Sequence, residues 1–173
     1  MTAKDFIQKW RHSINHLGLP SVGIHVGWDS IPVDSKVVCL SSKEAWEKIY
    51  NCTPPWFKTP QTFKELVISK NTDYLQIVQE ETANHKIEYY RNNGLHEPYF
   101  CAFAKKDDSF AMLGDGNHRF FDCISLMDIG KDFSNDIERA KLEIIYLKNF
   151  EEVLEPEEKI WGQNYNKNEF DLS

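Results

Sequence analysis

Residues 114–119, with the sequence GDGNHR, bring together side chains that are able to do chemistry. Asp115 can bind Mg²⁺ or accept a proton, and His118 can donate a hydrogen bond or move a proton near neutral pH. Arg119 offers a planar fork that fits phosphate or carboxylate. The stretch lies between a predicted strand and a predicted helix. Because the first amides of a helix have no intrahelical partners and lie at the positive end of its dipole, this junction predicts a phosphate site.

The two glycines and the asparagine of this stretch have both a functional and a structural interpretation. Gly114 and Gly116 let the backbone turn and approach a ligand closely, and Asn117 is a favoured N-cap residue. The structural alternatives are a common Asp-Gly turn, a simple cap at Asn117, an ion pair of Arg119 that fixes the fold, and a His118 that is satisfied within the protein. We interpret the combination of all these residue types at one strand-to-helix junction as a ligand site.

Hydrophobic periodicity predicts the elements that would position this loop. A polar turn over residues 106–109 joins two predicted strands, and Gly130 ends the helix that follows the loop. The predicted strands cover residues 21–28, 36–40, 98–105, 110–113 and 142–147. The predicted helices cover residues 4–17, 42–50 with Ser41 or Ser42 as its cap, 60–68 opened by Pro60, 72–92 ended by Gly94, and 118–130.

Composition limits the class of protein. Apolar residues make up 41% of the chain and aromatic residues 13%, which is enough for a well-filled core. The formal charge of −7 and the absence of a Lys- and Arg-rich run argue against a duplex DNA-binding face, although net charge does not exclude a local basic patch. Acidic residues collect after residue 150, where we expect a solvated tail.

The sequence also suggests a compartment. It has no apolar stretch of the ~20 residues that a membrane span needs and no apolar segment of a signal peptide at its start, so we expect a cytoplasmic protein without membrane contact. The cysteines show no CxxC spacing, and we expect reduced, buried thiols rather than zinc ligands or disulfides. These residues are Cys39, Cys52, Cys101 and Cys123.

Residues 87–126 resemble the core of ParB/sulfiredoxin-fold proteins. In these proteins a helix ends in a GL-x-x-P turn, and a strand, a turn, a second strand and a (D/G)G-x-x-R loop that opens a helix follow. GLHEP at residues 94–98 matches the first element and DGNHR at residues 115–119 the second. The resemblance extends over residues 85–148. It implies an α/β (α+β) fold, with a small mixed sheet and packed helices over residues 71–150. Periodicity and composition predict a mostly helical N-terminal extension over residues 1–70 and an acidic tail over residues 151–173, and we expect all three in one compact unit.

The resemblance implies a nucleotide, ATP or CTP with Mg²⁺, whose phosphates lie on the loop. Gly116, His118 and Arg119 match phosphate-binding positions, and Gly114 and Asn117 beside them are further candidates for binding the nucleotide. Sulfiredoxin has its catalytic cysteine where this chain has Asn117, so sulfinic acid reduction is not expected. The kinase-like members use acidic residues near the γ-phosphate, for which Asp115, also the candidate Mg²⁺ ligand, and Glu97 are the candidates. His118 completes the candidate catalytic set.

Three classes of function follow from these features. The first is a small phosphotransferase or nucleotide hydrolase, in a bacterial or phage context, with an unknown acceptor. The second is a non-catalytic nucleotide-responsive or protein-partner-binding module, whose interface could use Trp28, Trp46 or Trp56 if they are exposed rather than in the core. The third is a DNA-associated ParB-like accessory protein or nuclease. It is disfavoured by the charge and by the absence of a helix-turn-helix module after Leu147.

Overall fold

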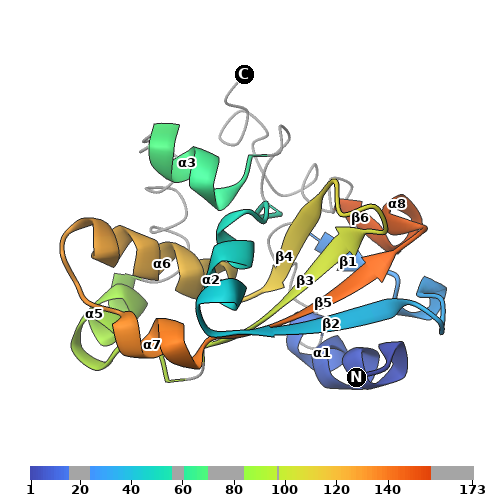
Figure 1. Ribbon diagram of the computed structural model, residues 1–173, viewed down its shortest axis with the longest axis horizontal. Coiled ribbons are helices and arrows are strands. Elements are labelled where there is room, and N and C mark those ends of the chain that lie inside the picture. The colour runs from blue at the N-terminus through green and yellow to red at the C-terminus, as the bar shows by residue number, and fades with distance from the viewer. Residues whose placement is uncertain (16–23, 56–60, 70–83, 97, 157–173) are drawn as a thin grey trace.

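The computed structural model describes residues 1–15, 24–55, 61–69, 84–96 and 98–156 (Figure 1). In chain order, the elements are α1 (Ala3–Asn15), β1 (Ile24–Val26), the 3-10 helix η1 (Trp28–Ser30), β2 (Lys36–Ser41), α2 (Ser42–Tyr50), α3 (Phe63–Ser69), α5 (Asn84–Asn93), β3 (Tyr99–Lys105), β4 (Ala111–Asp115), α6 (Asn117–Asp128), α7 (Ser134–Arg139), β5 (Lys141–Leu147), α8 (Phe150–Val153) and β6 (Leu154–Pro156). The chain therefore has the predicted α+β fold.

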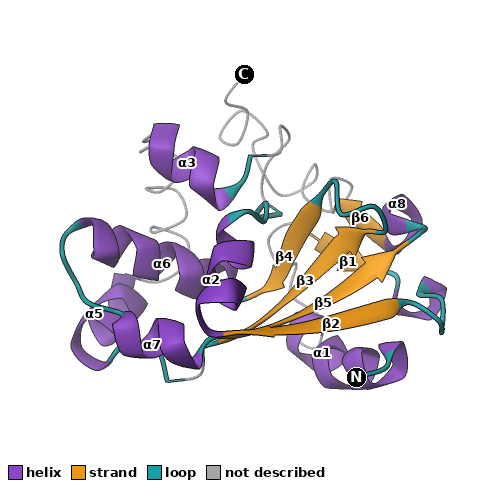
Figure 2. Ribbon diagram, viewed as in Figure 1, coloured by secondary structure: helices purple, strands orange, loops and turns teal. Residues whose placement is uncertain are grey.

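A mixed four-stranded sheet with the order β2-β5-β3-β4 lies at the centre of the fold (Figure 2). β3 and β5 are parallel, whereas β2 is antiparallel to β5 and β4 is antiparallel to β3. β1 and β6 form a separate antiparallel pair. β3 and β5 are neighbours in the sheet although α6 and α7 lie between them in the sequence. The ends of these strands therefore bring together segments that are far apart in the sequence.

Both faces of the sheet are covered. One hydrophobic core lies between the sheet and the helices α2, α3, α5 and α6, with the ring of Phe120 4.8 Å from that of Trp46 and 4.9 Å from that of Phe63. The other lies between the sheet and α1, η1, α8 and the β1–β6 pair, where Phe6 and Trp28 meet Phe103 edge-on. Because both faces of the sheet are covered, the sequence of β3 is mostly apolar rather than an alternation of apolar and polar residues.

The N-terminal part of the chain contributes to the same sheet and core. β2, from the segment that we expected as an extension over residues 1–70, pairs along its whole length with β5. Trp46 and Ile49 of α2 are buried beside residues of α6. Within the described part of the chain, no helix is long and apolar enough to cross a membrane.

The predicted boundaries are correct in most places and wrong in a few. Gly94 and Gly130, with φ of 70° and 94°, follow α5 and α6 as predicted. α3 begins at Phe63, three residues after the predicted Pro60, which lies outside the described residues, as do residues 72–83 of the predicted helix. α7 was not predicted. Ser41 precedes α2, but its side chain makes no capping hydrogen bond.

Two further predictions concern tryptophans and cysteines. Trp28 and Trp46 are buried, which rules out the exposed interface considered for them, and Trp56 lies outside the described residues. All four cysteines are free, and three of them are buried, whereas Cys39 is exposed. Burial raises the pKa of Cys52 to about 12, so this thiol stays protonated and packs as an apolar group.

Candidate functional site

The predicted loop is reduced to a single residue in the structure. β4 continues through Gly114 to Asp115, and α6 begins at Asn117, so only Gly116 lies between strand and helix. Gly114 and Asp115 are strand residues, which corrects the prediction that they belong to the loop. Cys101 pairs with Asp115 and Ala102 with Leu113, so Gly114 is the extra residue of a β-bulge. The bulge turns the end of β4 toward the start of α6.

Packing against aromatic rings explains why both of these positions are glycines. A Cβ atom at Gly114 would lie 2.5 Å from Cε2 of Phe103, and one at Gly116 would lie 2.4 Å from Cδ1 of Phe100. Gly116 also has a φ of 95°, which is left-handed backbone that favours glycine. The two glycines are thus required by the fold itself, whether or not a ligand approaches them.

Asn117 has a structural role that differs from the predicted one. The N-cap of α6 is Gly116, and Asn117 is the first helical residue, so the predicted Asn117 cap is wrong. The Asn117 side chain is buried, and its Nδ2 atom donates a 2.9 Å hydrogen bond to the backbone oxygen of Leu113. It ties the first turn of α6 to β4.

Arg119 lies against the start of β3. Its Nη2 atom donates a 2.9 Å hydrogen bond to the Tyr99 oxygen, and its guanidinium carbon lies 5.2 Å from the centre of the Phe100 ring. The same nitrogen is 3.9 Å from Oδ2 of Asp115. The structure therefore brings Asp115 and Arg119 together, and one edge of the guanidinium already has a role within the fold.

Asp115 is a partly buried carboxylate, with a side chain that is 34% exposed. Burial raises the pKa of Asp115 above its usual range, and this effect outweighs the opposing influence of Arg119 and of a hydrogen bond from the Gly116 amide. A carboxylate with a raised pKa is better able to accept a proton near neutral pH than an exposed one. The environment of Asp115 thus favours proton transfer.

The remaining candidates are His118 and Glu97. His118 is partly exposed in the first turn of α6, and Glu97 lies outside the described residues. The described residues contain no group of three His, Cys, Asp or Glu side chains that could hold a metal ion. Asp115 fits a Mg²⁺ ion only as a single ligand, with the other oxygens supplied by phosphate and water.

Sequence reasoning missed the residues of β3 and β5 that surround this junction. Tyr99 is 41% exposed, and the ammonium groups of Lys9 and Lys141 lie 6.0 and 5.9 Å from its ring centre. Glu143 is buried and accepts hydrogen bonds from Lys9 Nζ at 2.5 Å and Trp10 Nε1 at 2.6 Å, which fixes α1 to the sheet. A charged residue within the apolar strand KLEIIYL was a signal that could have identified Glu143.

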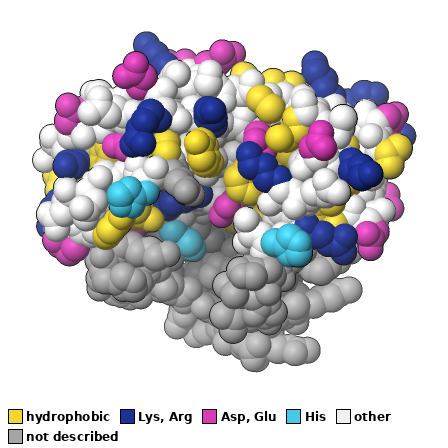
Figure 3. Space-filling view, turned by 90° about the horizontal axis from the view of Figure 1, so that it is seen from below, with side chains coloured by type: hydrophobic (Ala, Val, Ile, Leu, Met, Phe, Trp, Pro, Cys, Tyr) yellow, Lys and Arg dark blue, Asp and Glu magenta, His cyan; other side chains and the backbone are white. Residues whose placement is uncertain are grey.

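Charges of both signs are mixed on the molecular surface. Figure 3 shows Lys and Arg side chains interspersed with Asp and Glu over one face, without an extended area of one sign. Duplex DNA binding through phosphates needs an extended basic face. The face shown lacks that feature among its described residues.

No protein-family model matches this chain, and neither does any curated protein or solved structure. Functional inference therefore depends on the geometry of the residues themselves.

Proposed function

We propose that the chain binds a nucleotide, ATP or CTP, with its phosphates at the first turn of α6. The observation that carries the proposal is the start of this twelve-residue helix at Gly116, a residue without a side-chain oxygen to accept from the first amides. Arg119 places a guanidinium within the same turn, and its side chain is 26% exposed. Helix-terminal amides and a guanidinium together favour a phosphate ligand.

The neighbouring side chains suggest how such a nucleotide would be oriented. His118, one residue before Arg119 and partly exposed, would donate a hydrogen bond to a phosphate oxygen. Tyr99, whose backbone oxygen accepts the hydrogen bond from Arg119, is 41% exposed, and its ring would offer an aromatic face on which a base can stack. Lys141 near that ring would add positive charge, whereas the charge of Lys9 is offset by its ion pair with Glu143.

The catalytic form of this proposal is a small phosphotransferase or nucleotide hydrolase. Phosphoryl transfer depends mainly on positioning and on charge stabilisation rather than on covalent chemistry by the protein. Asp115 would accept the proton of the attacking hydroxyl group or water, a role that its raised pKa favours. Alternatively, Asp115 would hold Mg²⁺, which would neutralise phosphate charge when bound.

A non-catalytic nucleotide-responsive module is the second candidate. It is favoured by the structural use of the site: both glycines are required by aromatic packing, and Arg119 already binds a backbone oxygen. Asp115→Asn separates the two candidates, because it keeps the size of the side chain and removes its proton-accepting charge. Loss of nucleotide turnover with retained binding supports the enzyme, whereas wild-type protein that binds and shows no turnover supports the module.

Thermal unfolding with ATP or CTP and Mg²⁺ tests nucleotide binding itself. A ligand at about 100 times its Kd stabilises the folded state by about 2.7 kcal/mol, which for a chain of this size raises Tm by roughly 5–10 °C. We expect this shift in the wild type, and we expect it to fall by more than half in Arg119→Lys, which keeps the charge but loses the fork. Arg91→Ala is the matched control, because Arg91 is exposed and pairs only with the nearby Glu88 among described residues. Equal shifts in all three proteins would exclude the site.

A further inference from the structure

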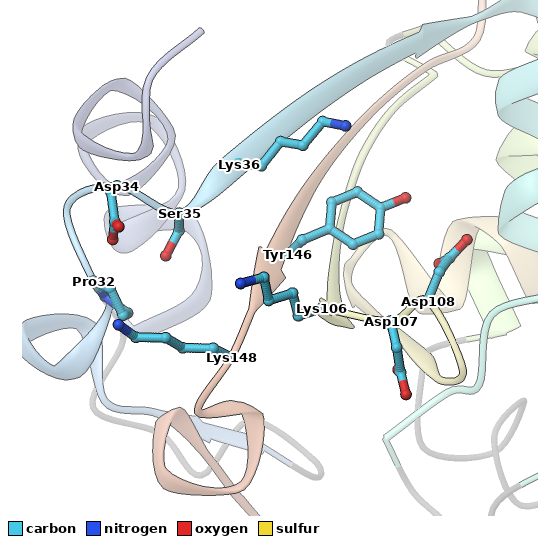
Figure 4. A pocket seen from close by; sticks show the side chains of 9 residues that line it. All are labelled: Pro32, Asp34, Ser35, Lys36, Lys106, Asp107, Asp108, Tyr146 and Lys148. Carbon is cyan, nitrogen blue, oxygen red and sulfur yellow. The ribbon is translucent and has the colours of Figure 1, made fainter.

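A pocket with a volume of about 420 Å³ lies at the other end of the sheet from Gly116 (Figure 4). Its walls come from the segment before β2, from the turn between β3 and β4, and from the end of β5. The register of the sheet shows that the pocket and Gly116 lie at opposite ends of it. The end of β4 at Asp115 pairs with Cys101 near the start of β3, whereas Ala111, at the start of β4, pairs with Ala104 near the end of β3.

Sheet topology brings three lysines to this pocket from remote parts of the sequence. Lys36 is the first residue of β2 and pairs with Tyr146 of β5. Lys106 follows β3, and its amide donates a 3.1 Å hydrogen bond to the Leu147 oxygen, which places it beside Lys148. All three lysines line the pocket. We refer to it as the lysine pocket, defined by Lys36, Lys106 and Lys148.

The three ammonium groups have no acidic partner in the part of the chain that the structure describes. No described carboxylate lies within 4.0 Å of any of them, whereas the nearby Lys48 pairs with Asp108 at 2.9 Å and Lys105 with Glu151 at 2.9 Å. On a chain with a formal charge of −7, three unpaired lysines around one pocket form a local excess of positive charge.

The acidic residues of the lining reduce this excess without cancelling it. Asp108 is already neutralised by Lys48, which makes two hydrogen bonds with it. Asp107 accepts hydrogen bonds from the amide and the hydroxyl group of Ser109, and Figure 4 shows its side chain directed away from Lys106. Asp34 is therefore the main acidic group that faces the lysines.

Hydrogen bonds fix the backbone from which these side chains extend. The Ser35 amide donates to the Pro32 oxygen at 3.0 Å, which closes the turn before β2. Asn149 Nδ2 donates to the Ser30 oxygen at 2.9 Å and holds the chain after Lys148 against the same segment. Because the walls are fixed before a ligand arrives, binding needs to order only the lysine side chains.

We propose that the lysine pocket binds a small phosphate-bearing anion, at a site distinct from the start of α6. The volume lies within the range of small-molecule sites. Asp34 and Asp107, which also line the pocket, would repel an extended polyanion such as nucleic acid more than a compact anion held among the lysines.

A titration with inorganic pyrophosphate, followed by ¹H–¹⁵N NMR spectra of the full chain, tests the proposal. We expect saturable shifts at the amides of residues 34–36, 106–108 and 146–148, with a Kd near about 1 mM, since exposed charge pairs contribute little each. Lys106→Gln with Lys148→Gln should weaken binding by about tenfold or more. Lys4→Gln with Lys64→Gln is the control, because it removes the same charge from exposed lysines elsewhere.

Three results would overturn the inference. Equal weakening by the two double substitutions would show a general charge effect. Loss of the pyrophosphate response in Arg119→Lys would place the anion at the start of α6 instead. Binding of a short DNA duplex that depends on Lys106 and Lys148 more strongly than pyrophosphate binding does would identify a nucleic-acid surface. A response that survives in Arg119→Lys and disappears in the Lys106/Lys148 double variant supports the lysine pocket.

Discussion

The two ends of the central sheet use their polar residues in opposite ways. At the α6 end, the residue types that suggested chemistry are largely used by the fold, since Gly114 and Gly116 fit against aromatic rings and Asn117 and Arg119 bind backbone oxygens. At the other end, Lys36, Lys106 and Lys148 have no acidic partner among the described residues, although nothing in their sequence context marks them. Residue type alone is therefore a poor guide to which end is free to bind a ligand.

This comparison separates two physical origins of a motif. GDGNHR is compact in sequence because a bulge, a left-handed glycine and a helix start must follow one another directly along the chain. The lysine pocket is dispersed in sequence because it arises from neighbouring strand ends in a sheet whose order differs from chain order. Local motifs can thus report backbone geometry, and ligand sites can arise without any local motif.

The largest expected effect is that of Gly116→Ala on stability. Gly116 and Gly130 have nearly equal φ, 95° and 94°, but a Cβ at Gly116 would meet Phe100 at 2.4 Å, whereas one at Gly130 would meet nothing within 4 Å. We expect Gly130→Ala to cost about 1 kcal/mol from backbone strain alone. Gly116→Ala should cost about 2–4 kcal/mol, because overpacking adds to that strain.

Urea unfolding of both variants measures this difference. Equal losses of unfolding free energy would mean that Phe100 moves aside without cost, and the conclusion that aromatic packing requires Gly116 would be lost. A substitution to valine at Gly116 is expected to prevent stable folding. It therefore cannot serve as a test of ligand binding.

The next prediction compares the loss of stability when one cationic residue from each end of the sheet is substituted. Arg119→Ala removes the hydrogen bond to the Tyr99 oxygen and the stacking on Phe100, and we expect a loss of about 1–2 kcal/mol. Lys106→Ala removes an exposed side chain without a described partner, and its effect should stay within about 0.5 kcal/mol. Unfolding free energies that reverse this order would contradict the contrast between the two ends.

The elements and sites that could be predicted from the sequence are those that depend on local interactions rather than on contacts across the sheet. The strands β3, β4 and β5 and the helix α6 were predictable, because alternation, periodicity and the glycines at residues 94, 116 and 130 are local signals. Two features were not predictable, because each depends on β3 across the sheet: the bulge at Gly114 and the position of Arg119. The lysine pocket depends entirely on the pairing of β2 and β3 with β5.

The smallest expected effect is the pH dependence of Asp115→Asn. In the folded protein, burial holds the pKa of Asp115 above its ordinary value of 3.8, so the charged form is disfavoured by folding. The contribution of the protonated Asp115 side chain to the stability of the folded protein is complete below pH 3.8. It is lost as the pH rises through the pKa that Asp115 has in the folded protein. At neutral pH the wild type therefore carries a cost that asparagine avoids. Because the Asp115 side chain is 34% exposed, solvent screening keeps this cost small, and we expect Tm to rise by no more than about 2 °C in the variant.

Thermal unfolding of the wild type and of Asp115→Asn tests this prediction. A range from about pH 3.5 to about pH 8 covers both the ordinary and the raised pKa values of a carboxyl group. The advantage of Asp115→Asn should be largest at neutral pH and should shrink to nothing as the pH falls toward 3.8. A variant that is instead less stable at neutral pH would mean that the contact of Asp115 with Arg119, at 3.9 Å, outweighs the burial of the carboxylate. In that case Asp115 and Arg119 form a structural ion pair, and Asp115 is not the proton acceptor of the site.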